Sequence, residues 1–403
     1  MSTGDGPGGT TTHQAHPAHQ PAGGFPAQPS APVNPTRRPL QRRWLTYGIM
    51  FTGFFLSWAV LSFFYGASFK LTVVLLAAVF AAIPMLVVVP TYLWLDRYEA
   101  EPLRFKLFAF FWGALCAPVG ALFLNTGIQR VLAASAGADG ASVIGAVLVA
   151  PPVEEGLKGL AILLIVLLRR REFDGVIDGI VYAGLSATGF AFSENILYLG
   201  RSYLLGGQDA LNHVFILRGV MGPFAHPLFT ACTGVGLGLA VAVLRTPLTR
   251  ILAGLGGFVC AMLLHGIWNL SASLNVHLAV YFFFQVPLFL AFVGMIVFLR
   301  SREGRLIRQH LSPYADAGWL TPADVGMLAS LGGRRTARAW ARAQGGKAAL
   351  DAMRSFQDGA SDLALLRSRM ARGMSEPGAH EHERVLLDSM VATRQAFLGR
   401  PVA

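Results

Sequence analysis

Long apolar stretches, interrupted by short polar segments, occupy most of residues 44–299 of this 403-residue chain. A transmembrane helix needs ~20 consecutive apolar residues, and eight stretches approach or exceed that length. The pattern therefore predicts an all-α polytopic membrane protein. Its eight transmembrane helices are expected at residues 44–65, 71–95, 106–128, 141–168, 175–200, 214–243, 251–272 and 277–299.

The two ends of the chain have a different pattern. Residues 1–40 are rich in Gly, Pro and Thr with few large apolar side chains, so we predict a disordered cytoplasmic tail. After residue 300 the chain becomes polar, and Thr321, followed by a proline and Asp324, marks a helix start. We expect a small cytoplasmic helical module that docks a cytoplasmic partner, with helices at 321–331, 336–357, 360–373 and 381–398. The predicted domains are thus 1–40, 41–300 and 301–403.

The composition agrees with a membrane protein: 54% of residues are hydrophobic, 14% are charged and the mean hydropathy is +0.51. These values exclude a water-soluble globule. Basic residues gather before the first predicted helix and in every second loop, which places both termini in the cytoplasm and requires an even number of spans. Arginines near the membrane favour anionic lipid as a partner, and we expect no nucleic acid.

Glu154, Glu155 and Lys158 interrupt the fourth apolar stretch. A carboxylate at that depth costs ~2.5–3.5 kcal/mol on insertion scales, so it marks a functional site. Pro151 and Pro152 predict a kink or break just before the glutamates. Glu154 and Lys158 are four residues apart and share a helix face, so a structural ion pair is one alternative. In that interpretation Glu155 points about 100° away and remains unpaired.

Three further polar groups interrupt the next three predicted helices: Glu194 with Asn195, then His226, then His265 with Asn269. We counted the depth of each residue from the predicted cytoplasmic end of its helix at ~1.5 Å per residue. The residues that lie about 21–28 Å deep, in one layer, are Glu154, Glu194, His226 and His265. We therefore expect these side chains to meet. The alternatives are a helix-bridging glutamate, a packing histidine and an interhelical hydrogen-bond pair of His265 with Asn269.

Together these groups contain a base, two imidazoles and an amide donor, the parts needed to activate water and to stabilise a tetrahedral oxyanion. Two mechanisms fit. In one, Glu194, His226 and His265 bind a zinc ion and a remaining glutamate acts as base. In the other, which has no metal, Glu154 assisted by a histidine deprotonates water, and His265 with Asn269 holds the oxyanion. The sequence has no HExxH zinc motif.

Five motifs follow one another over residues 90–270 in the order found in one known family. They are the acidic segment Asp96 to Pro102, Glu154-Glu155-Gly156-Leu157-Lys158, Phe190 to Glu194-Asn195, His226, and His265-Gly266-Ile267-Trp268-Asn269. In these motifs the chain resembles the PrsW family of intramembrane proteases, relatives of the CAAX-protease and bacteriocin-processing superfamily. Position 269 is Asn where some relatives have Asp.

The resemblance implies an integral protein of a bacterial cell membrane that cleaves single-pass, membrane-anchored substrates, of which anti-sigma factors are the best-known type. It implies catalysis by Glu154, Glu155, Glu194, His226 and His265, supported by Lys158, Asn195 and Asn269. The family is classed with metalloproteases, whereas its superfamily is also linked to a metal-free glutamate mechanism, so zinc stays one of two options. For the acidic segment we predict a structural role, with salt bridges to Arg97 or Arg104.

Two other classes of protein compete with a protease. An ion-coupled transporter also uses midplane carboxylates and a proline-broken helix. Carriers usually have duplicated halves, however, and the polar residues here crowd into predicted helices four to seven. A scaffold or receptor would use the same residues only to join helices. Arg218, near the start of the sixth predicted helix, either reaches the interface or meets a substrate carboxylate.

Overall fold

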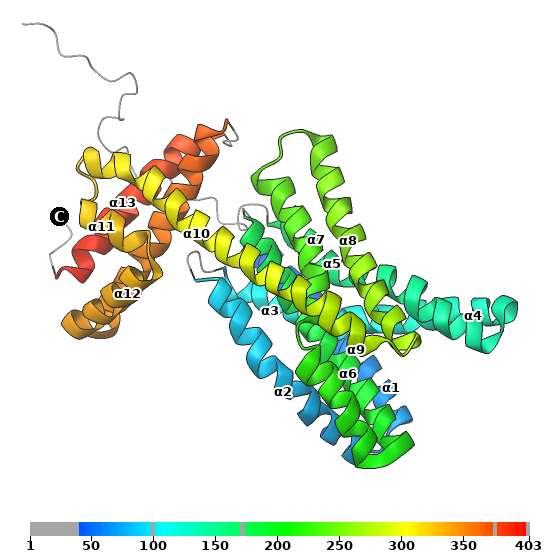
Figure 1. Cartoon of the computed structure of the whole chain (residues 1–403). Helices are drawn as coiled ribbons and strands as arrows, with labels where there is room; N and C mark the ends of the chain where they lie inside the picture. The colour runs from blue at the N-terminus through cyan, green and yellow to red at the C-terminus, as the bar shows by residue number, and fades with distance from the viewer. Residues whose placement is uncertain (1–39, 98–100, 170–172, 174, 374–376, 400–403) are drawn as a thin grey trace, which may run out of the picture. The chain divides into compact units, whose positions relative to one another are not determined.

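The computed structural model describes residues 40–97, 101–169, 173, 175–373 and 377–399, and these contain helices and no strand. The predicted disordered tail lies almost entirely outside the described residues. By compactness the chain divides into Met1–Ile49 and Met50–Ala403. The helices begin with α1 (Leu40–Ser68), α2 (Leu71–Leu95), α3 (Leu103–Phe111), α4 (Ala117–Ile144), α5 (Ala150–Leu168), α6 (Val176–Phe215), α7 (Ala225–Ala242) and α8 (Pro247–Ser273) (Figure 1).

Six stretches of the described chain are long and apolar enough to cross a membrane: Tyr47–Ser68, Leu71–Leu95, Leu103–Ser135, Val176–Ala242, Pro247–Ser273 and His277–Asp316. The fourth stretch has 67 residues and contains two of the predicted spans. Helix α5 carries Glu154, Glu155 and Lys158 within its 19 residues and is not among the six. The prediction of an all-α membrane protein is confirmed at this level.

Helix α6 packs closely against α7, and α7 packs closely against α8, because glycines replace side chains at the contacts (Figure 1). A Cβ atom on Gly179 of α6 would lie 2.1 Å from the carbonyl oxygen of Gly234 on α7. A Cβ atom on Gly257 of α8 would lie 2.4 Å from the carbonyl oxygen of Cys232 on α7. Small residues let membrane helices approach in this way, so α7 is held between the two helices that carry Glu194 and His265.

The helix that carries the paired glutamates is preceded by an irregular turn. A π-helical segment, η2 (Gly145–Val149), runs directly into α5, whose first turn contains Pro151 and Pro152. This interruption agrees with the break predicted from the two prolines. A second π-helical segment, η3 (Ile216–Met221), carries Arg218. Such π segments are rare and occur often at functional sites.

The chain continues through α9 (His277–Val280), η4 (Tyr281–Gln285), α10 (Val286–Asp316), α11 (Pro322–Leu328), α12 (Leu331–Ala371) and α13 (Ala379–Phe397). The last four helices share an apolar core that includes Leu311, Phe356, Leu363 and Met390. The predicted cap is present, because Thr321 and Asp324 form a reciprocal capping box. The predicted break between residues 357 and 360 is wrong: α12 runs through it.

Helix α12 departs from helical geometry earlier than predicted. The departure lies at Gly345 and Gly346, where Gly346 adopts a φ of +62° that glycine tolerates well. Gly359, at the break that the sequence suggested, lies within the helix, and a Cβ atom added there would lie 3.4 Å from the side chain of Met390. Contact with α13 therefore favours a small residue at this position. Helix α10 likewise continues without interruption across residue 300, where we placed a domain boundary.

Candidate active site

An ion pair lies at the centre of the buried polar cluster. Lys158 Nζ contacts Glu155 Oε1 at 2.5 Å, and both side chains are fully buried. Thr230 on α7 donates to Glu155 Oε2 at 2.7 Å, and His265 Nδ1 lies 2.9 Å from Glu155 Oε1. The interpretation that pairs Lys158 with Glu154 and leaves Glu155 unpaired is therefore wrong. Glu155 faces α7 and α8, which supply its other partners.

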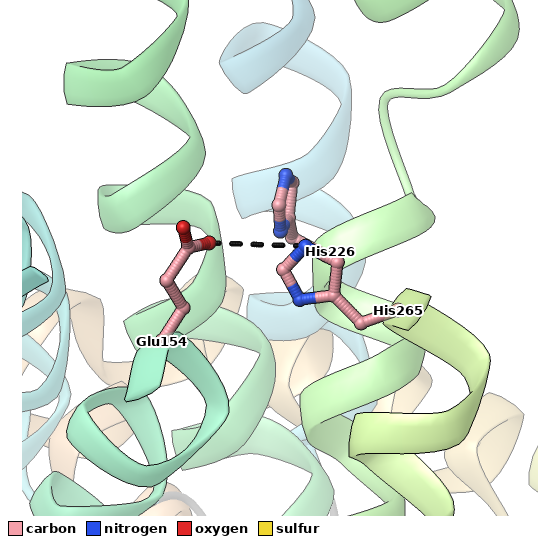
Figure 2. A group of neighbouring side chains, drawn as sticks. All are labelled: Glu154, His226 and His265. Atoms are coloured by element: carbon pink, nitrogen blue, oxygen red, sulfur yellow. Dashed lines mark ion pairs between the residues drawn. The ribbon is translucent and has the colours of Figure 1, made fainter. Parts of the chain in front are cut away.

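The two histidines lie beside each other, one from α7 and one from α8. Their rings are perpendicular with centroids 5.0 Å apart, and the His265 ring stacks on Phe229. Because the Glu155 carboxylate only accepts hydrogen bonds, Nδ1 of His265 carries the proton of that contact. The other ring nitrogen, Nε2, faces Glu154 Oε2 at 3.8 Å (Figure 2).

Glu194 belongs to the same cluster but has different partners. Its Oε2 atom lies 2.9 Å from His226 Nε2 and forms an ion pair with Arg218. Arg218 also donates from Nε to Asn195 Oδ1 at 2.7 Å, and its guanidinium stacks 4.1 Å from the Tyr198 ring centroid. Arg218 therefore meets a carboxylate of its own chain. Its position in an apolar segment was the signal that could have assigned it to the site.

Glu154 is the carboxylate of the cluster without a lysine or arginine partner. Glu155 pairs with Lys158 and Glu194 pairs with Arg218, whereas Glu154 forms no ion pair with a lysine or arginine of the described chain. Its Oε1 atom accepts from Asn125 Nδ2 at 3.3 Å. Its Oε2 atom is buried and has no hydrogen-bond partner among the described residues. Sequence reasoning missed Asn125, which lies on α4, outside the five motifs.

One group in the described chain has the donor set and spacing of a metal site. Glu154, His226 and His265 each offer a ligand atom, and these atoms lie within 4.8 Å of one another. Carboxylate and imidazole are normal zinc ligands, and the contact from Glu155 to His265 Nδ1 is the kind of outer hydrogen bond that orients such a ligand. The residues therefore fit a metal ion in type and spacing. Glu154 takes the place that we expected for Glu194.

His226 would have to change partners to join a metal site. Its Nε2 atom faces Glu194, and its Nδ1 atom lies 3.3 Å from the ammonium of Lys158. An ammonium donates and a carboxylate accepts, so the neutral imidazole is satisfied at both nitrogens. Binding of a metal by His226 therefore competes with one of these two contacts, whereas the ring nitrogen of His265 that faces Glu154 is available.

A cavity of about 1190 Å³ adjoins the cluster, and Glu154, Glu194, Arg218 and Asn269 line it. Asn269 donates from Nδ2 to the carbonyl oxygen of Ala146 in η2 at 2.8 Å. One of its two amide hydrogens is thus used to hold α8 against the π-helical turn, and the other is not committed by that contact. The cavity gives a large ligand access to the buried polar groups.

The acidic segment is separate from this cluster. Asp96 forms an ion pair with Lys106 and accepts from the backbone N–H of Glu101 at 3.1 Å. Tyr182 on α6 donates to Glu101 Oε2 at 2.7 Å. Residues 98–100 lie outside the described residues. The contacts are those of a structural element that ties the loop after α2 to α3 and α6, and Lys106 is a partner that we did not predict.

Apolar helices that enclose carboxylates, imidazoles and a cavity fit an enzyme that acts within a membrane, and comparison with known proteins separates this class from a transporter. Residues 101–293 match the family model described as PrsW family intramembrane metalloprotease. The chain is 34% identical to Protease PrsW of Geobacillus kaustophilus over 174 residues, which are 43% of this chain and 69% of that protein. The chain therefore belongs to the PrsW family and is an intramembrane endopeptidase.

Two other relatives match shorter parts of the family sequence. Protease PrsW of Bacillus subtilis is 34% identical over 145 residues, which are 36% of this chain and 60% of that protein. Protease PrsW of Oceanobacillus iheyensis is 34% identical over 108 residues, which are 27% of this chain and 45% of that protein. No solved structure gives a significant match. The matches are to proteases, so they do not favour the transporter alternative.

Proposed function

We propose that this protein hydrolyses peptide bonds of single-pass membrane proteins, an anti-sigma factor among them, with Glu154 as the base that activates water. The observation that carries the proposal is the pairing of charges. Of the three glutamates in the cluster, Glu155 pairs with Lys158 and Glu194 pairs with Arg218, whereas Glu154 keeps a buried oxygen atom without a partner in the described chain. That atom is free to accept a proton from water, as a general base must do.

The other polar residues have positioning roles in this proposal. Glu155, held by Lys158 and Thr230, fixes the tautomer and orientation of His265. Glu194, held by Arg218, does the same for His226. The free nitrogen of His265 faces the oxygen of Glu154 that has no hydrogen-bond partner, so both lie where a water molecule would be activated.

If a zinc ion is bound, Glu154, His226 and His265 would hold it, and Glu154 would then be a ligand in place of the base of the metal-free mechanism. A bound zinc ion would supply Lewis acidity, which makes a coordinated water more acidic and polarises a carbonyl group. In either case the tetrahedral oxyanion needs N–H donors. Asn269 lines the cavity and has an amide hydrogen beyond the one given to Ala146, so we assign it to this role. Asn195 supports Arg218.

We retain the predicted topology as part of the proposal, with eight spans and both termini in the cytoplasm of a bacterium. Helix α5 then crosses the bilayer although it carries three charged residues, because each of them faces the protein interior: Glu154, Glu155 and Lys158 are all buried. The stretch Val176–Ala242 supplies two spans. The C-terminal helices form the cytoplasmic module that docks a partner, and anionic lipid covers its basic residues.

The test compares Glu154→Gln with the wild-type protein in cells that contain tagged single-pass membrane proteins. Glutamine keeps the oxygen that accepts from Asn125 and removes the base, so we expect cleavage to be lost without loss of fold. Asp209→Asn is the matched control, since Asp209 is an exposed acid of the same chain. Fragments are identified by mass spectrometry. Equal cleavage by wild type and Glu154→Gln would overturn the proposal.

A further inference from the structure

The cavity beside the active site is larger than a small ligand needs. At about 1190 Å³ it exceeds the ~300–1,000 Å³ of typical small-molecule pockets. Its walls come from α1, α4, η2, α5, α6, η3, the end of α8 and α9. Such a space fits a stretch of polypeptide beside Glu154 rather than a single side chain.

Helix α4 turns a polar face to this cavity. Asn125, Thr126 and Gln129, which we call the polar strip, line the cavity within about one helical turn, and they continue the line of Pro118 and Leu122. The opposite face of α4 carries large apolar side chains, with Phe123 64% and Leu124 49% exposed. In a membrane protein that face meets lipid. The two amides therefore face the cavity, Asn125 half-buried and Gln129 exposed, and neither belongs to the catalytic motifs.

The two amides of the polar strip have hydrogen-bonding capacity to spare. Asn125 donates to Glu154 through Nδ2, and its Oδ1 atom is buried with no partner in the described chain. Gln129 forms no side-chain hydrogen bond with the described residues. Its side chain lies against Gly145 of η2, where an added Cβ atom would come within 2.6 Å of Nε2. A buried acceptor without a donor is costly, so this site is built for a ligand that supplies N–H groups.

An extended peptide backbone has the matching chemistry and spacing. Asn125 and Gln129 are separated by ~6 Å along the helix axis, and equivalent N–H groups on one edge of an extended chain repeat every two residues, at ~6.6 Å. A transmembrane substrate must be unwound at the cleaved bond, and its freed backbone groups then need partners because lipid offers none. Asparagine and glutamine amides offer one donor group and one acceptor each.

We propose that the polar strip of α4 binds the unwound substrate segment in an extended conformation, through hydrogen bonds to its backbone N–H and C=O groups. The strip sets the register of the peptide against Glu154, because Asn125 contacts that carboxylate directly. This inference rests on the proposed function and adds the backbone-binding site to it. Recognition of the backbone is independent of side chains, so this site accepts substrates of varied sequence.

Gln129→Leu is the informative variant, because Gln129 has no hydrogen bond to the described catalytic residues and leucine keeps most of its volume. We expect KM for a membrane substrate to rise about two- to ten-fold, the effect of one lost hydrogen bond, with kcat unchanged within about two-fold. Ile128→Leu on the lipid face is the matched control and should leave both constants unchanged. Gln129→Asn keeps an amide group on a shorter side chain, so its rise in KM should be smaller than that of Gln129→Leu. It is the second variant to measure if leucine perturbs the fold.

A second measurement separates backbone binding from a structural role of Gln129. Substrates are made with single amide-to-ester replacements around the cleaved bond, which remove one N–H each. If the strip binds the backbone, one ester raises KM for the wild type but not for Gln129→Leu. If every ester raised KM by the same factor in Gln129→Leu as in the wild type, the proposal would be overturned. An unchanged KM in Gln129→Leu would overturn it as well. Absence of cleavage by the wild type would instead overturn the proposed function itself.

Discussion

Removal of Lys158 tests whether the buried ion pair stabilises the fold of the active site. Its ammonium contacts Glu155 at 2.5 Å and His226 Nδ1 at 3.3 Å, and it lies 4.8 Å from the ring centroid of Phe190. In Lys158→Met the Glu155 carboxylate stays fully buried without its cation. Loss of one partner of a buried pair costs ~3–5 kcal/mol.

The cost should fall at the lower end of that range, because Glu155 keeps its contacts with Thr230 and His265. We therefore expect Lys158→Met to reduce the free energy of unfolding by about 3 kcal/mol. This corresponds to about two orders of magnitude in the folding equilibrium and to a fall in Tm of ~6 °C at ~2 °C per kcal/mol. The measurement is thermal unfolding of the purified protein in detergent.

The double variant Glu155→Gln/Lys158→Met separates the pair from simple packing. It contains neither charge, and the neutral amide can still accept from Thr230, so we expect it to recover more than half of the lost stability. Glu155→Gln alone leaves the Lys158 ammonium buried and should be destabilised as well. A double variant as unstable as the sum of the two single variants would refute the reasoning, since the two side chains would then act independently.

Three further outcomes are expected. Arg218→Gln should lower kcat by ~10–100-fold, as is typical for loss of a residue that orients a catalytic ligand. Arg218→Lys should retain more activity because it keeps a positive charge beside Glu194. An equal kcat in the wild type and both variants would contradict this. Gly234→Val should lower the free energy of unfolding by ~1–3 kcal/mol, because its Cβ atom would lie 2.1 Å from the carbonyl oxygen of Gly179. An unchanged Tm in thermal unfolding would exclude this close packing. The amount of zinc bound per protein, measured by elemental analysis, should fall when the wild type is treated with a chelator and should be lower in His265→Ala than in the wild type. If the wild type cleaves its substrate but binds no zinc, the metal-free mechanism holds.

The order of apolar and polar residues was sufficient to identify the fold class and most of the cluster. Carboxylates and imidazoles in apolar helices are costly unless they meet one another, so Glu154, Glu194, His226 and His265 could be grouped from the sequence alone. The depth arithmetic placed them in one layer, and the structure brings all four together. Helix spacing is regular, which is why a count of residues predicts depth.

Partner choice was decided by the tertiary structure alone. Along one helix Lys158 can reach either the third or the fourth residue before it, and only the approach of α7 and α8 gives Glu155 the additional partners Thr230 and His265. That choice leaves Glu154 as the carboxylate without a lysine or arginine partner in the described chain. Asn125 could not be found from sequence either, because an asparagine in an apolar helix has no distinguishing pattern until the fold places it beside a glutamate 29 residues away.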